Sequence, residues 1–102
     1  MYSLEYLPSA KRDMEDIARY ISRELANPAA AEKMAVEMVE AADRLTDFPY
    51  ASPAYHPIRP LTQEYRRLLV RNYILFYCVD ETRKLITVAR VIYARRDYDK
   101  LL

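Results

Sequence analysis

Apolar and polar residues alternate at the start of the chain and then change to a helical spacing. Residues 2–7 alternate with a period of two, which predicts a short strand. Pro8 ends this strand, and Ser9 follows it as a candidate N-cap. From there apolar residues recur every three or four positions and predict a helix to about Ala26. Its apolar face consists of Ala10, Met14, Ile17, Ala18, Ile21 and Leu25.

The dipeptide Asn27-Pro28 predicts the end of this helix and the start of a second one. The residue before a proline avoids helical dihedrals, whereas asparagine caps a new helix whose first position suits proline. Two helices joined by so short a turn fold back as an antiparallel hairpin, which we expect over residues 9–48. The apolar face of the second helix consists of Ala31, Met34, Ala35, Met38, Ala42 and Leu45.

Residues 48–60 hold four prolines, which exclude a helix and a central strand. This segment predicts an ordered connector between the helices and the rest of the chain. It contains His56, the only histidine. A metal site needs several ligands and a histidine base needs an orienting partner, so we expect His56 to have a surface or packing role.

The remaining residues are rich in β-branched and aromatic side chains. They predict strands at 64–70, 73–79 and 84–93, with turns between them. The order β-α-α-β-β-β favours an α+β fold and a single domain over residues 1–102. We expect the N-terminal strand and the helical hairpin to pack on an antiparallel meander, with one sheet face left less covered.

The distribution of charge along the chain is more informative than the overall composition. The 102 residues carry 16 basic and 15 acidic side chains. However, residues 1–58 hold six basic and ten acidic groups, whereas residues 59–102 hold ten and five. Eight of those ten cations are arginine, whose planar guanidinium suits phosphate and carboxylate groups. The basic half is either a solubilising face or a surface for a polyanion.

Several kinds of site are excluded by residues that the sequence lacks. Without a glycine it has no P-loop and no dinucleotide-binding fingerprint. It also lacks the motifs of metallohydrolases, Ser-His-Asp triads and CxxC redox sites, so we expect neither a metal nor a cofactor.

Cys78 lies alone in an apolar run, which predicts a buried, inert thiol in a reducing compartment. No stretch reaches the ~18 apolar residues of a membrane span, so we expect a cytoplasmic protein with no membrane partner.

Four motifs follow the order of the predicted elements. They are L-x-x-F-P at 45–49, Y-R-R-L-L-V at 65–70, Y-I-L-F-Y-C-V-D at 73–80 and V-x-R-V-I-Y-A-R-R-D-Y at 88–98. Together they resemble the RelE/ParE superfamily of type II toxin-antitoxin toxins, which includes plasmid stabilisation proteins, over nearly the whole chain. The resemblance implies a small cytoplasmic growth inhibitor that a cognate antitoxin neutralises. It leaves the oligomeric state open.

The superfamily has two activities, and the resemblance implies different residues for each. ParE-like members inhibit DNA gyrase, whereas RelE-like members are endonucleases that cleave mRNA in the ribosomal A site. In RelE-like members a basic residue follows the tyrosine that opens the third strand, but here Ile74 follows Tyr73. This difference and the long helical hairpin favour the ParE branch. Its expected target-binding residues are Arg71, Arg90, Arg95 and Arg96. The RelE alternative implies a catalytic set of Arg66, Arg67, Arg95 and Tyr98.

Arg95, Arg96 and Tyr98 leave the predicted sheet where its last strand ends, so they are free to meet a large partner. The structural alternative is that either arginine pairs with a nearby aspartate or a helix glutamate. For Arg90, the structural alternative to target binding is an ion pair with a helix carboxylate across the edge of the core.

A third hypothesis is a non-enzymatic RNA-binding domain in which some of the ten tyrosines stack on bases. The predicted strand order does not match the common sheet-based RNA modules. For the antitoxin, the charge distribution predicts an acidic segment with apolar anchors that binds the basic, less covered sheet face and weakens with salt.

Overall fold

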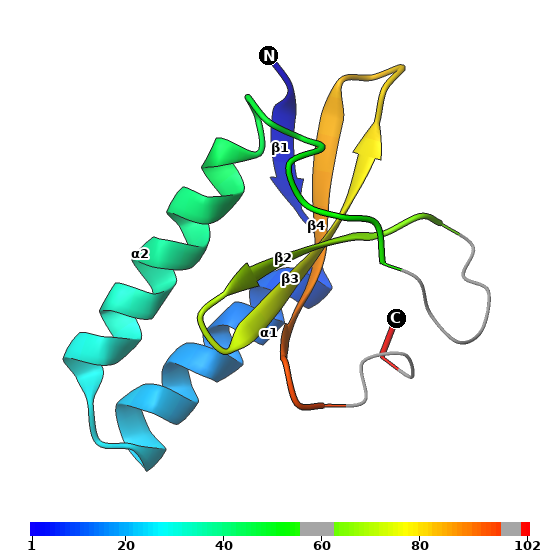
Figure 1. Ribbon diagram of the computed structural model, residues 1–102. Coiled ribbons are helices and arrows are strands. Elements are labelled where there is room, and N and C mark those ends of the chain that lie inside the picture. Colours follow the sequence, from blue (N-terminus) through cyan, green and yellow to red (C-terminus); the bar gives the residue numbers. More distant parts are fainter. Residues whose placement is uncertain (56–62, 97–100) are drawn as a thin grey trace.

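The chain folds into a four-stranded sheet and a helical hairpin (Figure 1). The computed structural model describes residues 1–55, 63–96 and 101–102. His56 and Tyr98 therefore lie outside the described residues. The element order confirms the predicted β-α-α-β-β-β arrangement and its α+β class. The elements are β1 (Ser3–Tyr6), α1 (Pro8–Arg19), the π-helix η1 (Tyr20–Glu24), α2 (Pro28–Arg44), β2 (Arg66–Val70), β3 (Tyr73–Asp80) and β4 (Leu85–Tyr93).

The sheet has the strand order β1-β4-β3-β2. Strands β2, β3 and β4 form the predicted antiparallel meander. Strand β1 joins it at the far side by pairing in parallel with β4, with Ser3 opposite Leu85 and Tyr6 opposite Val88. The first strand of the chain therefore lies beside the last, and β1 and β2 form the edges of the sheet.

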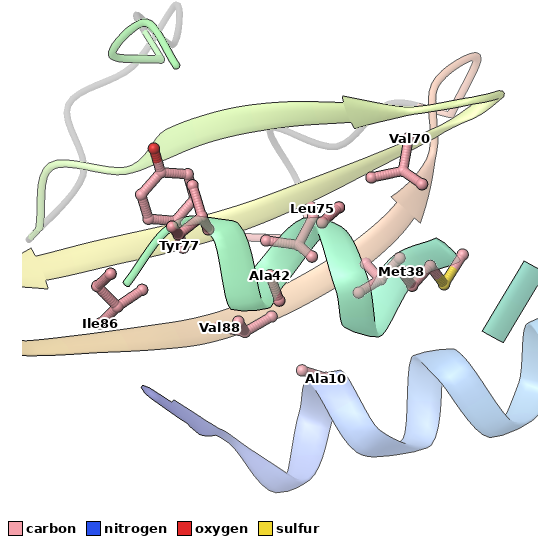
Figure 2. Close-up of a cluster of buried hydrophobic side chains, with 11 residues drawn as sticks. Ala10, Met38, Ala42, Val70, Leu75, Tyr77, Ile86 and Val88 are labelled. Atoms are coloured by element: carbon pink, nitrogen blue, oxygen red, sulfur yellow. The ribbon is translucent and has the colours of Figure 1, made fainter. Parts of the chain in front are cut away.

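The helical hairpin covers one face of the sheet and encloses the main core (Figure 2). At the centre of this core Tyr77 is fully buried, and its hydroxyl donates to the carbonyl oxygen of Pro49 at 2.8 Å. Among the described residues, the opposite face carries a smaller cluster of three buried residues. That cluster contains Ile74, Phe76 and Ile92, packed against Tyr55, Tyr65, Ala94, Leu101 and Leu102.

The first helix begins differently from the prediction. Leu7 is its N-cap, no side chain caps it, and Pro8 occupies the first turn. A proline in the first turn has no backbone N–H that needs a partner and its φ already suits a helix, which favours the start of the helix at this position. The prediction that Ser9 caps the helix is wrong. Its hydroxyl instead donates to the carbonyl oxygen of Ala89 in β4 at 2.7 Å.

The hairpin turn combines a π-helix with a left-handed residue. After Arg19 the α-helix gives way to η1, so the first helix is not regular up to Ala26 as predicted. Ala26 has a φ of 49° and reverses the chain without a glycine. The predicted cap of the second helix is confirmed, because the Asn27 side chain accepts a hydrogen bond from the Ala30 N–H at 3.1 Å.

The proline-rich connector runs along the start of β2. Ala54 forms an isolated bridge with Arg66, and the Arg67 N–H donates to the carbonyl oxygen of Pro53 at 3.2 Å. The described part of the connector is thus ordered against an edge strand, as the prolines predicted. Within residues 1–55, 63–96 and 101–102, no helix has the length and hydropathy to cross a membrane.

Candidate functional site

Two arginines follow directly after the last strand, beside the β2–β3 turn. The Ala94 N–H donates to the carbonyl oxygen of Asn72 at 2.9 Å, and the Arg96 N–H donates to that of Tyr93 at 3.0 Å. These bonds hold the backbone of Arg95 and Arg96 at the end of the sheet. Both side chains are exposed, and neither forms an ion pair with another described residue. The nearby aspartates, Asp97 and Asp99, lie outside the described residues.

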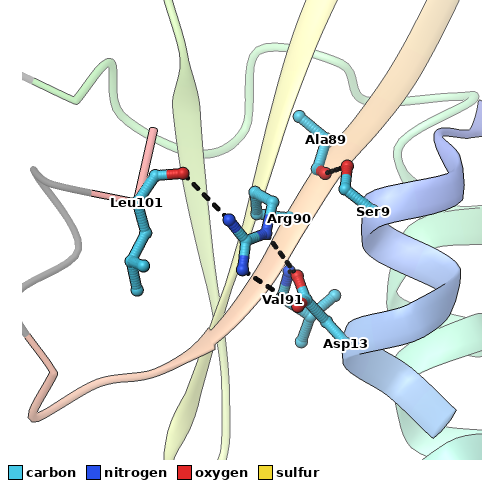
Figure 3. Close-up of polar contacts among 6 residues, drawn as sticks. All are labelled: Ser9, Asp13, Ala89, Arg90, Val91 and Leu101. Atoms are coloured by element: carbon cyan, nitrogen blue, oxygen red, sulfur yellow. Dashed lines mark hydrogen bonds and ion pairs between the residues drawn. The ribbon is translucent and has the colours of Figure 1, made fainter. Parts of the chain in front are cut away.

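Arg90, in contrast, uses all three guanidinium nitrogens inside the chain (Figure 3). Its Nε and Nη2 donate to Asp13 at 2.7 and 3.0 Å, and its Nη1 donates to the carbonyl oxygen of Leu101 at 2.9 Å. Asp13 also accepts the Val91 N–H at 2.9 Å. The alternative of a pair with a helix carboxylate is thus confirmed, and we assign Arg90 the role of holding α1 and the Leu101 backbone against β4.

Arg71 lies in the β2–β3 turn, where it has a φ of 54° and a bidentate pair with Glu37 of α2. Its Nη2 donates to Glu37 Oε1 at 2.8 Å, and its Nε donates to Oε2. These hydrogen bonds lower the pKa of the Glu37 carboxyl and raise the pKa of the Arg71 guanidinium. Arg71 is exposed, but its charge is balanced by a helix carboxylate.

Arg66 and Arg67 belong to opposite faces of the sheet, since successive strand residues alternate. The Arg66 Nη1 donates to the carbonyl oxygen of Ser52 at 2.6 Å, and its guanidinium lies 4.7 Å from the centre of the Tyr50 ring. The side chain is mostly buried, whereas that of Arg67 is exposed.

Arg66 also lies far from Arg95. In the sheet, Arg66 pairs with Tyr77, and Tyr77 pairs with Val88 of β4. The end of β4 at Tyr93 lies five residues further along, a distance of roughly 16 Å at about 3.3 Å per residue. The structure therefore does not bring Arg66, Arg67 and Arg95 around one point.

An exposed network that the sequence did not reveal joins the β3–β4 turn to two other segments. The hydroxyls of Tyr2 and Tyr50 both donate to Glu81 Oε1, and the Lys84 Nζ donates to Oε2 at 3.0 Å. The hydrogen bonds with Glu81 raise the pKa of Tyr50 to about 12, and those from both tyrosines and Lys84 lower the pKa of Glu81 to about 2. Tyr2 and Glu81 are 79 residues apart, so no local pattern could pair them.

Cys78 is half-buried, and its Sγ donates to Gln63 Oε1 at 3.2 Å. Burial raises the pKa of this thiol to about 11, which makes it a poor nucleophile at neutral pH. Among residues 1–55, 63–96 and 101–102, no group of three His, Cys, Asp or Glu side chains is arranged to hold a metal ion.

Comparisons with known proteins give a consistent result. A family model described as "ParE toxin of type II toxin-antitoxin system, parDE" matches residues 4–98. The chromosomal ParDE system from P. aeruginosa superposes with a TM-score of 0.73 and 20% identity, covering 93% of this chain and 98% of the other. The toxin-antitoxin complex RelBE2 from Mycobacterium tuberculosis superposes with a TM-score of 0.65 and 18% identity, covering 90% of this chain and 96% of the other. The archaeal RelE-RelB complex from Pyrococcus horikoshii OT3 superposes with a TM-score of 0.62 and 14% identity, covering 93% of this chain and 97% of the other. A search of curated protein sequences found no match.

Proposed function

Because this chain belongs to the ParE toxin family of type II toxin-antitoxin systems, we propose that it arrests bacterial growth by binding DNA gyrase through Arg95 and Arg96. The observation that carries this proposal is the placement of the two arginines. They are exposed, they form no ion pair with a described residue, and they stand at the end of the sheet where a large partner can approach.

The distribution of the other arginines supports an inhibitor over a RelE-like nuclease. Cleavage of RNA needs a proton acceptor and several fixed cations around one phosphate. Here Arg66 and Arg67 lie on opposite faces of the sheet. Arg95 lies beyond the end of β4, which is roughly 16 Å along the sheet from Arg66. Ile74 also stands where RelE-like proteins carry a basic residue. Binding through a surface needs no such convergence.

We further propose that the toxin acts in the cytoplasm and is neutralised by a cognate antitoxin. The solved relatives support this partner, since their descriptions name toxin-antitoxin systems or complexes. The asymmetry of charge, with ten basic and five acidic groups in residues 59–102, favours an acidic antitoxin segment.

The test is the double variant Arg95→Ala/Arg96→Ala in a gyrase supercoiling assay. We expect its inhibitory concentration to rise at least about tenfold, because hot-spot arginines typically contribute more than 1 kcal/mol. The matched control Arg12→Ala/Arg83→Ala removes two exposed arginines elsewhere, from α1 and the β3–β4 turn, and should inhibit like the wild type. Thermal melting of both variants checks that the fold is intact.

Supercoiling that continues at saturating wild-type toxin would reject gyrase as the target. In that case, codon-positioned mRNA cuts in a translating extract would favour the ribosome-dependent nuclease instead. Equal inhibition by both double variants would show that Arg95 and Arg96 do not contact gyrase.

A further inference from the structure

Two adjoining hollows lie at the tip of the helical hairpin. They have volumes of ≈ 480 and ≈ 370 Å³ and share Leu25, Asn72 and Tyr73. The lining comes from η1, the start of α2, the β2–β3 turn and the end of β4. We call this feature the tip groove. Its remaining lining residues are Tyr20 and Tyr93 in the first hollow, and Ile21, Ala30, Lys33, Met34 and Arg71 in the second.

Exposed apolar side chains converge in the tip groove. Leu25 is 58% exposed, Tyr20 46% and Tyr93 38%. Tyr93 also packs edge-to-face on Tyr73, with 5.7 Å between the ring centres. Single exposed apolar residues are common, but a concave cluster of them is typical of a binding site.

The π-helix explains why two of these side chains lie together. The Leu25 N–H donates to the carbonyl oxygen of Tyr20 at 3.2 Å, a hydrogen bond between residues five apart. This closure places Tyr20 and Leu25 on the same side of the turn, whereas in an α-helix neighbours on one side are three or four apart. Irregular π turns of this kind are frequent at functional sites.

A few basic side chains lie at the two ends of the tip groove, and none of the described residues that line it is acidic. At one end Lys33 and Arg71 share the carboxylate of Glu37, which leaves a net positive charge. At the other end, Arg95 and Arg96 follow next in the chain after Tyr93 and Ala94, held beside Asn72 by the backbone hydrogen bond described above.

We propose that the tip groove is the anchor site for the target protein, receiving one large apolar side chain from an acidic segment of that protein. This inference rests on the proposed function and extends the contact made by Arg95 and Arg96. Those arginines and Lys33 complement carboxylates on either side of the anchor. A hollow of ≈ 480 Å³ has the size of pockets that bury a compact ligand group.

The lining favours a protein segment over a nucleic acid. Its lining includes the flexible apolar side chains of Ile21, Leu25 and Met34, which can pack against a branched or bent side chain as well as a flat one. The rings of Tyr73 and Tyr93 are inclined at 62°, so they do not form a parallel slot for a base. Nucleic acid binding also depends on many phosphate contacts, whereas few unmatched cations surround this groove.

The experiment compares Leu25→Ser with Leu69→Ser, which removes a 66% exposed leucine from the edge strand β2 outside the groove. Binding of each purified variant to gyrase is measured by calorimetry at low and high salt, and growth arrest is scored in cells. We expect Leu25→Ser to weaken gyrase binding about tenfold or more and to relieve growth arrest. The Leu69→Ser variant should match the wild type in both assays, and melting checks that both variants fold.

The outcomes separate this inference from the gyrase proposal. If the wild type does not bind gyrase but Leu25→Ser alone relieves growth arrest, the groove stands and gyrase is the wrong target. If both variants bind and arrest growth like the wild type, the groove is not an anchor site. Loss of antitoxin binding with unchanged gyrase binding, or loss of affinity for a duplex DNA probe, would also overturn the proposal.

Discussion

Tyr77 and Tyr6 both pack their rings in or against the main core, but their hydroxyls differ. The Tyr77 hydroxyl donates to the carbonyl oxygen of Pro49, whereas the buried Tyr6 hydroxyl has no hydrogen-bond partner among the described residues. We therefore expect Tyr77→Phe to lower the free energy of unfolding by about 1 kcal/mol, and Tyr6→Phe to leave it unchanged or raise it by up to about 1 kcal/mol. Urea unfolding followed by circular dichroism measures both. Equal losses would mean that the Tyr6 hydroxyl finds a partner in solution.

Asp13 is the residue on which three hydrogen bonds converge, two from Arg90 and one from the Val91 N–H. Its side chain is only 15% exposed, so replacing it leaves a poorly hydrated guanidinium and an unpaired backbone donor. We expect Asp13→Ala to lower the free energy of unfolding by about 2–4 kcal/mol.

The same helix supplies a matched control for this prediction. Asp16 pairs with Arg19 at 2.9 Å, but its side chain is 70% exposed, and exposed pairs contribute little. Asp16→Ala should therefore change the unfolding free energy by no more than about 0.5 kcal/mol. A loss for Asp13→Ala as small as that of Asp16→Ala would contradict the structural role given to Arg90.

At the scale of elements, Glu81 ties the β3–β4 turn to the start of the chain and to the connector through Tyr2 and Tyr50. The pKa of Glu81 falls from 4.5 to about 2 on folding, so its stabilisation is full above pH 4.5 and disappears as the pH falls towards 2. The pKa of Tyr50 rises from 10.0 to about 12, so the same contact also weakens above pH 10.

The variant Glu81→Gln tests this pH dependence. Between pH 7 and pH 2.5, the urea midpoint of the wild type should converge on that of Glu81→Gln, because the variant lacks the titrating carboxyl. The groups are exposed, so solvent screening keeps the difference small. A gap between the two midpoints that stays constant down to pH 2.5 would contradict the network.

The elements themselves were largely predictable because their signals are local. Helical spacing and the Asn27-Pro28 pair fixed the second helix, and strand alternation placed Arg66 and Arg67 on opposite faces. The role of Ser9 was not predictable, since its hydrogen bond goes to Ala89, 80 residues away. The π-helix was missed for a different reason, because a five-residue closure leaves the apolar spacing of the sequence nearly unchanged.

At the scale of the whole molecule, the candidate site was predictable only in part. The exposure of Arg95 and Arg96 followed from their position after the last predicted strand. The tip groove did not, because its lining combines Tyr20 of η1 with Tyr93 of β4, two residues that are far apart in the sequence. Arg90 was left open between two roles for the same reason, since Asp13 lies 77 residues away.

The place of β4 inside the sheet has a consequence for how the protein is made. During synthesis, β1 and α1 leave the ribosome long before β4, the strand on which both pack. Ser3 pairs with Leu85 of β4, and the Ser9 hydroxyl donates to the carbonyl oxygen of Ala89 in the same strand. Contacts so distant in sequence also close slowly. The fold therefore cannot be completed until β4 has left the ribosome, and until then chaperones and proteases meet a chain whose first strand and helix lack their packing partner.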